Sequence, residues 1–144
     1  METYQAEVLV NERFHLSEGP VWDAETGVLH FVDIKGCTVN TYRLSDGQRT
    51  STEVNQNVGC FALRRQGGYI LGLTAGVYLR SEDGRRIEKL PEPVYDPMTR
   101  SNDGKCDPQG RFWCGTSDLV KGEKRGKLYL LPGDGRCIEM LDRL

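Results

Sequence analysis

Two short polar stretches carry the side chains best suited to chemistry. In the stretch 17–22 the carboxylate of Glu18 comes just before an apolar run, and in 100–105 a guanidinium, an amide and a carboxylate follow one another. Carboxylate and amide oxygens are the ligands that a hard divalent cation prefers. Arg and Asn side chains are suited to the hydroxyl or carboxylate groups of a substrate. Glu18, Arg100 and Asn102 are therefore the candidate binding residues.

A repeat of about 41 residues decides how these side chains are positioned. Glycine-led apolar stretches begin at Gly27, Gly68 and Gly110, which are 41 and 42 residues apart. This spacing is typical of the blades of a β-propeller, each a four-stranded antiparallel sheet of roughly 40–50 residues. Glu18 and Asn102 come just before equivalent inner strands of the first and third repeat. We therefore expect both to face the central channel at the same end.

Each repeat reads as four strands joined by tight turns. The last two strands of each repeat are separated by an Asp-Gly pair, at 46–47, 83–84 and 134–135. An Asp-Gly pair between two β-rich runs is a strong hairpin signal. No segment of ten or more residues has a clean helical period. The sequence predicts an all-β domain with blades at 12–55, 56–95 and 96–144, and an insertion at 117–125 in the third blade.

Composition argues against several classes of partner. The net charge is −2 and charged residues of both signs make up 28% of the chain, which is unlike a nucleic-acid-binding or membrane-binding surface. The first residues show no secretory signal, and no apolar stretch approaches the ~20 residues that cross a bilayer. The five cysteines are odd in number and form no CxxC pair, which favours free thiols in a reducing cytosol. We expect a cytoplasmic protein.

Three blades do not close a ring, because propellers use four to eight. Residues 4–10 read as a further strand with no repeat to join, and we interpret 1–11 as a ring-closing strand whose partners lie beyond Leu144. The sequence therefore predicts the N-terminal half of a longer protein. Open blade edges and an uncovered blade face favour self-association of the isolated chain.

Several of these stretches, in order, resemble one enzyme family. The chain is similar to the senescence marker protein (regucalcin)/gluconolactonase family in EGPVW (18–22), LHFVDI (29–34), GGY (67–69) and RSNDGKCDPQGRF (100–112). The resemblance implies a six-bladed propeller about twice this length. It also implies one divalent metal ion in the channel and hydrolysis of a sugar lactone. Calcium or zinc is the favoured metal, with magnesium, manganese or iron as alternatives.

The resemblance assigns roles residue by residue. Glu18 matches a metal-ligand glutamate, and Arg100 and Asn102 match residues that hold the sugar hydroxyls. Asp118 is the nearest candidate for an acidic substrate contact, although it is out of register. The remaining metal ligands, including the aspartate that serves as the base, match nothing in this chain, so it carries no catalytic residue and should be inactive alone. Ser101 departs from the family, where this position is commonly aromatic.

The sequence also allows other interpretations of the chain and of its candidate residues. The chain could be a non-catalytic propeller scaffold or a binding fragment, or two copies could assemble one ring. Glu18 could be a solvated loop acid, Arg100 could pair with Asp96 or Asp103, and Asn102 could cap a turn. For five further residues we favour a structural role. Asp103 and Asp107 are interpreted as turn formers, His30 as a packed residue, and Trp22 and Trp113 as core residues.

Overall fold

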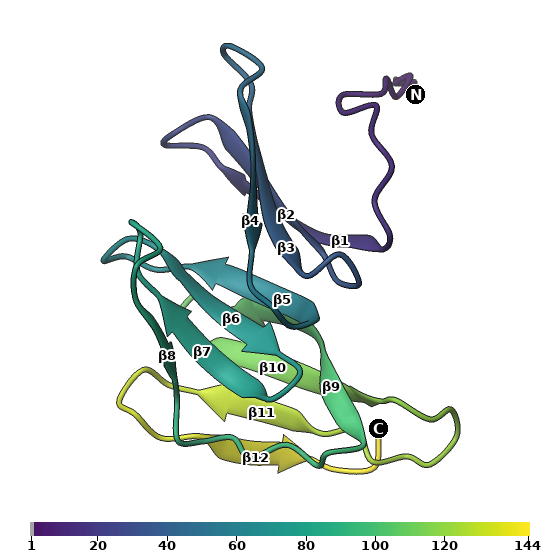
Figure 1. The fold of residues 1–144 in the computed structure, drawn as a ribbon, viewed down its shortest axis with the longest axis vertical. Coiled ribbons are helices and arrows are strands. Elements are labelled where there is room, and N and C mark those ends of the chain that lie inside the picture. The colour runs from purple at the N-terminus through teal and green to yellow at the C-terminus, as the bar shows by residue number, and fades with distance from the viewer. Residues whose placement is uncertain (1) are drawn as a thin grey trace.

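The computed structural model describes residues 2–144, and these form twelve β-strands in three antiparallel sheets without a helix (Figure 1). Blade 1 comprises β1 (Ser17–Asp23), β2 (Val28–Asp33), β3 (Thr38–Arg43) and β4 (Arg49–Glu53). Blade 2 comprises β5 (Val58–Leu63), β6 (Tyr69–Leu73), β7 (Gly76–Arg80) and β8 (Ile87–Lys89). Blade 3 comprises β9 (Thr99–Cys106), β10 (Phe112–Asp118), β11 (Leu128–Leu131) and β12 (Ile138–Leu141).

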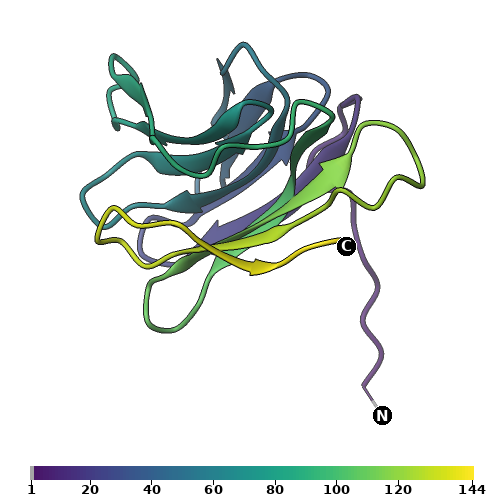
Figure 2. The ribbon, with the colours of Figure 1, turned by 90° about the horizontal axis from the view of Figure 1, so that it is seen from below.

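The three sheets follow one another in an arc. In each sheet the strands pair in sequence order, so the first strand and the fourth strand are the two edges. The first strands approach one another, since β1 contacts β5 and β5 contacts β9 (Figures 1 and 2). They therefore form the inner side of the arc. The predicted all-β, partial propeller is confirmed.

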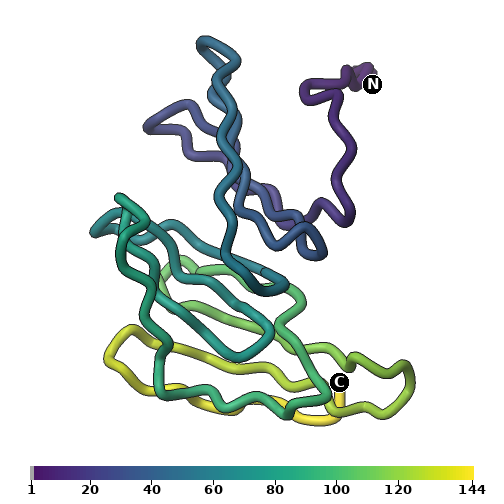
Figure 3. Tube along the Cα trace, viewed as in Figure 1, coloured from purple at the N-terminus to yellow at the C-terminus, as the bar shows by residue number. Residues whose placement is uncertain are grey.

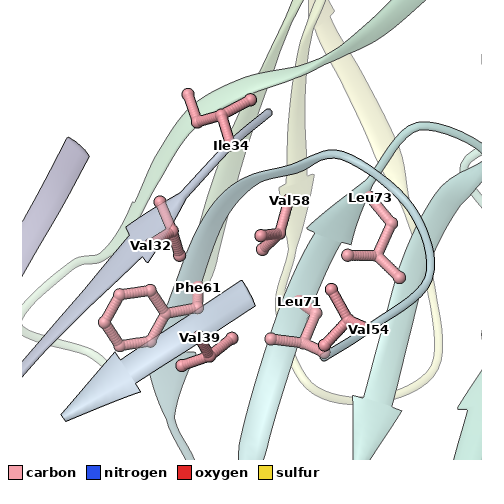
Figure 4. Close-up of a cluster of buried hydrophobic side chains, with 8 residues drawn as sticks. All are labelled: Val32, Ile34, Val39, Val54, Val58, Phe61, Leu71 and Leu73. Atoms are coloured by element: carbon pink, nitrogen blue, oxygen red, sulfur yellow. The ribbon is translucent and has the colours of Figure 1, made fainter. Parts of the chain in front are cut away.

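Two apolar clusters hold the blades together. Between blades 1 and 2, β2 and β3 pack against β5 and β6, with the linker 54–57 closing the cluster (Figure 4). Its buried members are Val32, Ile34, Val39, Val54, Val58, Phe61, Leu71 and Leu73. The cluster between blades 2 and 3 is richer in polarisable groups, comprising Cys60, Ala62, Val77, Tyr95, Phe112, Cys114, Tyr129 and Leu131.

The glycine-led strands β2 and β10 differ in how their two faces are buried. Phe31 and Val32 are both buried although adjacent side chains of a strand point to opposite faces. Val32 is covered by blade 2, and Phe31 on the other face is covered by Phe14, whose ring centroid is 5.1 Å away. In β10, by contrast, Phe112 and Cys114 are buried while Trp113 between them is half-buried. Blade 3 packs against blade 2 on one face only, so β10 alternates.

The Asp-Gly pairs form the predicted hairpin turns. In each turn the aspartate Oδ1 accepts a hydrogen bond from the backbone N–H two residues further on, with N···O distances of 2.9 to 3.1 Å. The glycine that follows has a positive φ of 69° at Gly47 and Gly84 and 85° at Gly135. Only glycine adopts this conformation without steric cost, which explains its place in all three turns.

The N-terminal segment differs from expectation. Residues 4–10 form no strand; they run away from β1 and are largely exposed (Figure 3). Their ring-closing role and the domain boundaries stay predictions. The core assignment of Trp22 is wrong here, since this residue is 50% exposed on the face of blade 1 that is turned away from blade 2. Residues 2–144 include no helix able to cross a membrane.

Candidate functional site

All three inner strands are interrupted by a bulge at the same level. The register of β1 against β2 breaks between Glu18 and Val21, and that of β5 against β6 breaks around Gly59. In β9 the pairing with β10 passes from Ser101 to Asp103, which leaves Asn102 without an opposite residue. Bulges redirect side chains and are frequent beside active sites. The repeat thus places Glu18 and Asn102 at equivalent irregularities of the first and third blade.

The bulges also correct the expected boundaries. The sequence places Glu18 and the Arg100–Asn102 stretch just before their inner strands, whereas the structure places them inside β1 and β9. Polar residues next to glycine break the alternation that identifies a strand, and at a bulge such residues are tolerated within it. Pairing with β2 and with β10 therefore holds the backbone before and after these residues.

Glu18 is an exposed and uncommitted carboxylate. Among residues 2–144, no hydrogen bond or ion pair to its side chain is present, so it is not the partner of a neighbouring cation. It borders a hollow of about 340 Å³, whose other walls include Val10, Phe14 and Phe31. Gly19 follows with a positive φ of 59°, which turns the chain directly after the carboxylate. An acid without a protein partner beside an apolar surface is available to a ligand.

Arg100 and Asn102 form one unit. Nη1 of Arg100 donates to the backbone oxygen of Ser101 at 2.8 Å and to Oδ1 of Asn102 at 3.1 Å. The interpretations of Arg100 as the partner of Asp96 or Asp103, and of Asn102 as a turn cap, are therefore wrong for this structure. The contact fixes the amide orientation, so the Asn102 NH₂ group and the remaining guanidinium N–H groups are left to donate elsewhere.

Glu18 and the Arg100–Asn102 unit are not in contact. They lie on β1 and β9, the first and third of the three inner strands, with β5 between them. Asn102 borders a separate hollow of about 370 Å³ that Glu18 does not reach. The described residues hold the two parts on the same side of the arc without forming a closed pocket around them.

Asp118 has a structural task in this chain. It ends β10 opposite Thr99, and its Oδ1 accepts a hydrogen bond from the backbone N–H of Arg125 at 2.9 Å. This contact closes the inserted loop. Ser117, the neighbour of Asp118, is opposite Arg100, so Asp118 points to the other face of the sheet from Arg100. Its substrate role stays a prediction.

Asp33 is a positioning residue that the motifs do not single out. Its carboxylate accepts hydrogen bonds from the backbone N–H groups of His15, Leu16 and Gly36 at 2.8 to 3.0 Å. Burial raises the pKa of Asp33, but the three N–H donors together outweigh this and hold the pKa below its usual value. The clamp fixes the chain just before Glu18. A lone aspartate at the end of a strand gives no sequence signal of such a task.

Asp107 confirms its prediction as a turn former. Its Oδ1 accepts from the backbone N–H groups of Gln109 and Arg111, each at 3.0 Å. Its Oδ2 accepts from Nε1 of Trp113 at 2.9 Å and from Nε of Arg111 at 2.6 Å. His30 is a packed residue, as expected: it is 8% exposed, and its Nδ1 lies 3.1 Å from the Tyr69 hydroxyl.

The described residues fit a metal ion only in part. Across residues 2–144, no three His, Cys, Asp or Glu side chains gather closely enough to hold one. Glu18 is a suitable anionic oxygen ligand, but a hard cation needs several converging oxygens. Within residues 2–144, Glu18 is therefore not joined by two further ligands of these types.

Comparison with known proteins gives consistent relatives. The chain is 36% identical over 123 residues to 6-deoxy-6-sulfogluconolactonase of Pseudomonas putida, covering 85% of the chain and 42% of that protein. It is 32% identical over 148 residues to regucalcin of Xenopus laevis, covering 99% of the chain and 50% of that protein. The chain thus spans about half the length of the curated relatives it matches.

Solved structures agree in fold. A calcium-binding protein, regucalcin, from Agrobacterium tumefaciens superposes with a TM-score of 0.87 at 22% identity, over 95% of this chain and 46% of that one. A luciferin-regenerating enzyme superposes with a TM-score of 0.80 at 29% identity, over 91% of this chain and 47% of that one. The family model described as SMP-30/Gluconolactonase/LRE-like region matches residues 16–144. With the match extending through all three blades and both polar stretches, the chain belongs to the SMP-30/gluconolactonase/LRE-like family.

Proposed function

We propose that this chain supplies part of the active site of a metal-dependent enzyme that hydrolyses a sugar lactone. Glu18 is proposed as one ligand of a divalent cation, and Arg100 with Asn102 as the group that holds the sugar hydroxyls. The observation that carries the proposal is the pair of matching bulges, one bearing an uncommitted carboxylate and the other a preorganised guanidinium–amide unit. The family and its lactonase members support the reaction class.

The residues present have definable tasks in such a reaction. A divalent cation, when bound, polarises a lactone carbonyl and stabilises negative charge on its oxygen. Glu18 would contribute negative charge and one oxygen to that cation. The Arg100 guanidinium and the Asn102 amide would donate hydrogen bonds to ring hydroxyls, so the lactone is oriented before water attacks. A carboxylate outside this chain would accept the proton from water.

The first prediction concerns the charge of Glu18. In a polypeptide that joins this chain to the remaining blades, Glu18→Gln keeps the shape of the side chain but removes its charge. Metal affinity should fall at least about 10-fold, because even residues that only support a ligand cost 10- to 100-fold when changed. Lactone hydrolysis should fall with it and recover in part at high metal concentration. Calorimetric titration beside lactonase kinetics measures both.

One matched control and two comparison variants make this experiment specific. Glu25→Gln changes an exposed acid in the turn after β1 and should leave metal affinity unchanged. Arg100→Ala and Asn102→Ala should raise KM for the lactone with little change in metal affinity, because they contact the sugar. If Glu18→Gln binds metal as tightly as the parent, Glu18 is a solvated acid and the site assignment fails.

A second candidate is a non-catalytic propeller that binds partners on its rim. It would not require an uncommitted acid and an oriented guanidinium at matching inner positions. The two proposals differ in one measurement: a scaffold would show no lactone turnover with all blades present and any divalent metal added. The fold and the family would then stand, and only the activity would be lost.

A further inference from the structure

Two buried cysteines face each other across the junction between blades 2 and 3. Cys60 belongs to β5 and Cys114 to β10, and their sulfur atoms are 3.7 Å apart. The two residues are 1% and 0% exposed, and both thiols are free. The remaining three cysteines are exposed or half-buried. This is the one place where the described chain brings two sulfur atoms within hydrogen-bonding reach.

Two glycines make the room for these sulfur atoms. A side-chain carbon at Gly72 would lie 2.6 Å from the Cys60 sulfur and 3.1 Å from the Cys114 sulfur, and one at Gly104 would lie 2.8 Å from the Cys60 sulfur. Such distances are too short for carbon and sulfur in contact. Neither glycine has a positive φ, so backbone conformation does not explain why glycine occupies these two positions. The space they leave is filled by the thiol pair.

A third group prepares the pair for reaction. The Tyr95 hydroxyl lies 3.1 Å from the Cys114 sulfur. The hydrogen bond shared with Cys114, together with burial, raises the pKa of Cys60. Hydrogen bonds from Cys60 and Tyr95 lower the pKa of Cys114, against burial and the negative charge of Asp103. The Tyr95 contact therefore favours Cys114 as the thiol that ionises, and the thiolate is the reactive form.

We propose that Cys60 and Cys114 form a reversible disulfide that joins blade 2 to blade 3. The sulfur atoms must approach by about 1.7 Å to reach the length of an S–S bond. Closing this distance requires the two side chains to rotate towards each other. The pair is independent of the proposed lactonase function, because neither thiol belongs to that site.

Hydrogen peroxide is a sufficient oxidant for this step. The Cys114 thiolate attacks one peroxide oxygen, the O–O bond breaks, and the leaving hydroxide takes a proton to become water, which leaves a sulfenic acid. The Cys60 sulfur then attacks the sulfenic sulfur, the S–O bond breaks, and the departing hydroxide takes the Cys60 proton as a second water. Two thiols and one peroxide thus give one disulfide and two waters, and a dithiol reductant reverses the change. Transient opening of the blade junction admits the small reactants.

The link would act on the strand that carries the candidate site. Cys114 is paired with Gly104 on β9, two residues after Asn102, and the Cys60 sulfur lies against that same glycine. A covalent bond from β5 to β10 therefore encloses β9 and prevents blade 3 from separating from blade 2. Because the two cysteines are 54 positions apart, the disulfide also restricts the unfolded chain over a long loop.

The sequence allows a direct test, since trypsin places each cysteine on its own peptide. The five peptides are 36–43, 50–64, 106–111, 112–121 and 137–143. The chain is oxidised in native buffer with a small excess of hydrogen peroxide, remaining thiols are alkylated, and the digest is analysed by mass spectrometry. We expect 50–64 linked to 112–121 as the dominant product, reversed by dithiothreitol. The oxidised protein should melt roughly 5 °C or more above the reduced one.

Controls decide between a built pair and chance oxidation. Cys106→Ala removes an exposed thiol and should leave the link unchanged, whereas Cys60→Ala should leave Cys114 as a sulfenic acid that dimedone traps. Oxidation in concentrated guanidinium chloride should give a mixture of links instead of one. If the native protein gives mainly 112–121 linked to 137–143, or only modified Cys106, the proposal is overturned. The proposal is also overturned if oxidation of the native protein gives as mixed a set of disulfides as oxidation of the denatured protein. This comparison uses the parent protein alone and requires no variant.

Discussion

The direction of the Arg100 guanidinium is set by contacts within the chain itself. Its guanidinium has five N–H donors, and one nitrogen is already committed to the Ser101 carbonyl and the Asn102 amide oxygen. The remaining donors keep a fixed direction, since the planar group cannot turn without breaking these bonds. Asn102 is held by the same contact. Glu18 is different: nothing in residues 2–144 restrains its carboxylate, so a cation would have to order it.

Asp107 gives a prediction at the same scale, from its pKa. The hydrogen bond from Trp113 lowers that pKa most, and hydrogen bonds from Arg111 lower it further. Burial acts in the opposite direction, and the resulting pKa is about 2. Because the pKa in the folded state is below the ordinary value, the ionised carboxylate stabilises the fold fully above that value, and the contribution is lost as the pH falls towards 2. Asp107→Asn should therefore lower the urea midpoint at pH 5, and the difference from the parent should shrink steadily as the pH falls towards 2.

Urea titrations of both proteins between pH 2 and pH 5 measure this difference. Asp142→Asn, an exposed acid near the last residue, serves as the control and should have no effect at any pH. A deficit of Asp107→Asn that is the same at pH 2 as at pH 5 would show that the lost charge is not its cause.

Among the structural elements, the strands were predictable and the bulges were not. The 41-residue spacing and the Asp-Gly pairs identify all twelve strands. Both signals are local, because they come from the residues that form the turns between neighbouring strands. The bulges depend on how neighbouring inner strands approach, which no local pattern encodes. For that reason Glu18 and Asn102 were expected before their strands and lie within them. Trp22 was expected in the core because its strand position is apolar, but no blade covers that face here.

Gly59 tests the contact between inner strands. A side-chain carbon at this position would lie 2.1 Å from the backbone oxygen of Ser101, so β5 and β9 meet backbone to backbone there. Gly59→Ala should push blades 2 and 3 apart and destabilise the fold by about 1–3 kcal/mol, the usual cost of overpacking. Denaturant unfolding measures the change.

Gly115→Ala is the matched control, because a side-chain carbon there would meet its nearest atom at an ordinary 3.6 Å. That substitution should cost far less. If both substitutions lower the free energy of unfolding equally, the loss at Gly59 comes from replacing a glycine in a strand. The close approach of β5 and β9 would then not be its cause.

The molecule as a whole leaves apolar surface open at both ends of the arc. Trp22 is 50% exposed on blade 1, and Ile138, Met140 and Leu141 on the outer strand of blade 3 are 38%, 43% and 54% exposed. Unpaired strand edges and apolar faces of this kind favour association between chains. We expect the isolated chain to self-associate at micromolar concentration, as measured by light scattering after size-exclusion chromatography. A stable monomer that unfolds cooperatively would contradict this.

The lactonase assay of the isolated 144-residue chain, with calcium or zinc added, tests the central claim most directly. Circular dichroism first confirms the β-sheet fold, so that inactivity cannot be blamed on an unfolded sample. Because the proposed function gives this chain one carboxylate ligand and places the base outside it, we expect the chain to bind the metal weakly and to hydrolyse gluconolactone no faster than buffer does. Robust turnover that is lost in Glu18→Gln would contradict the account of a partial site, and would point instead to a ring completed by a second copy of the chain.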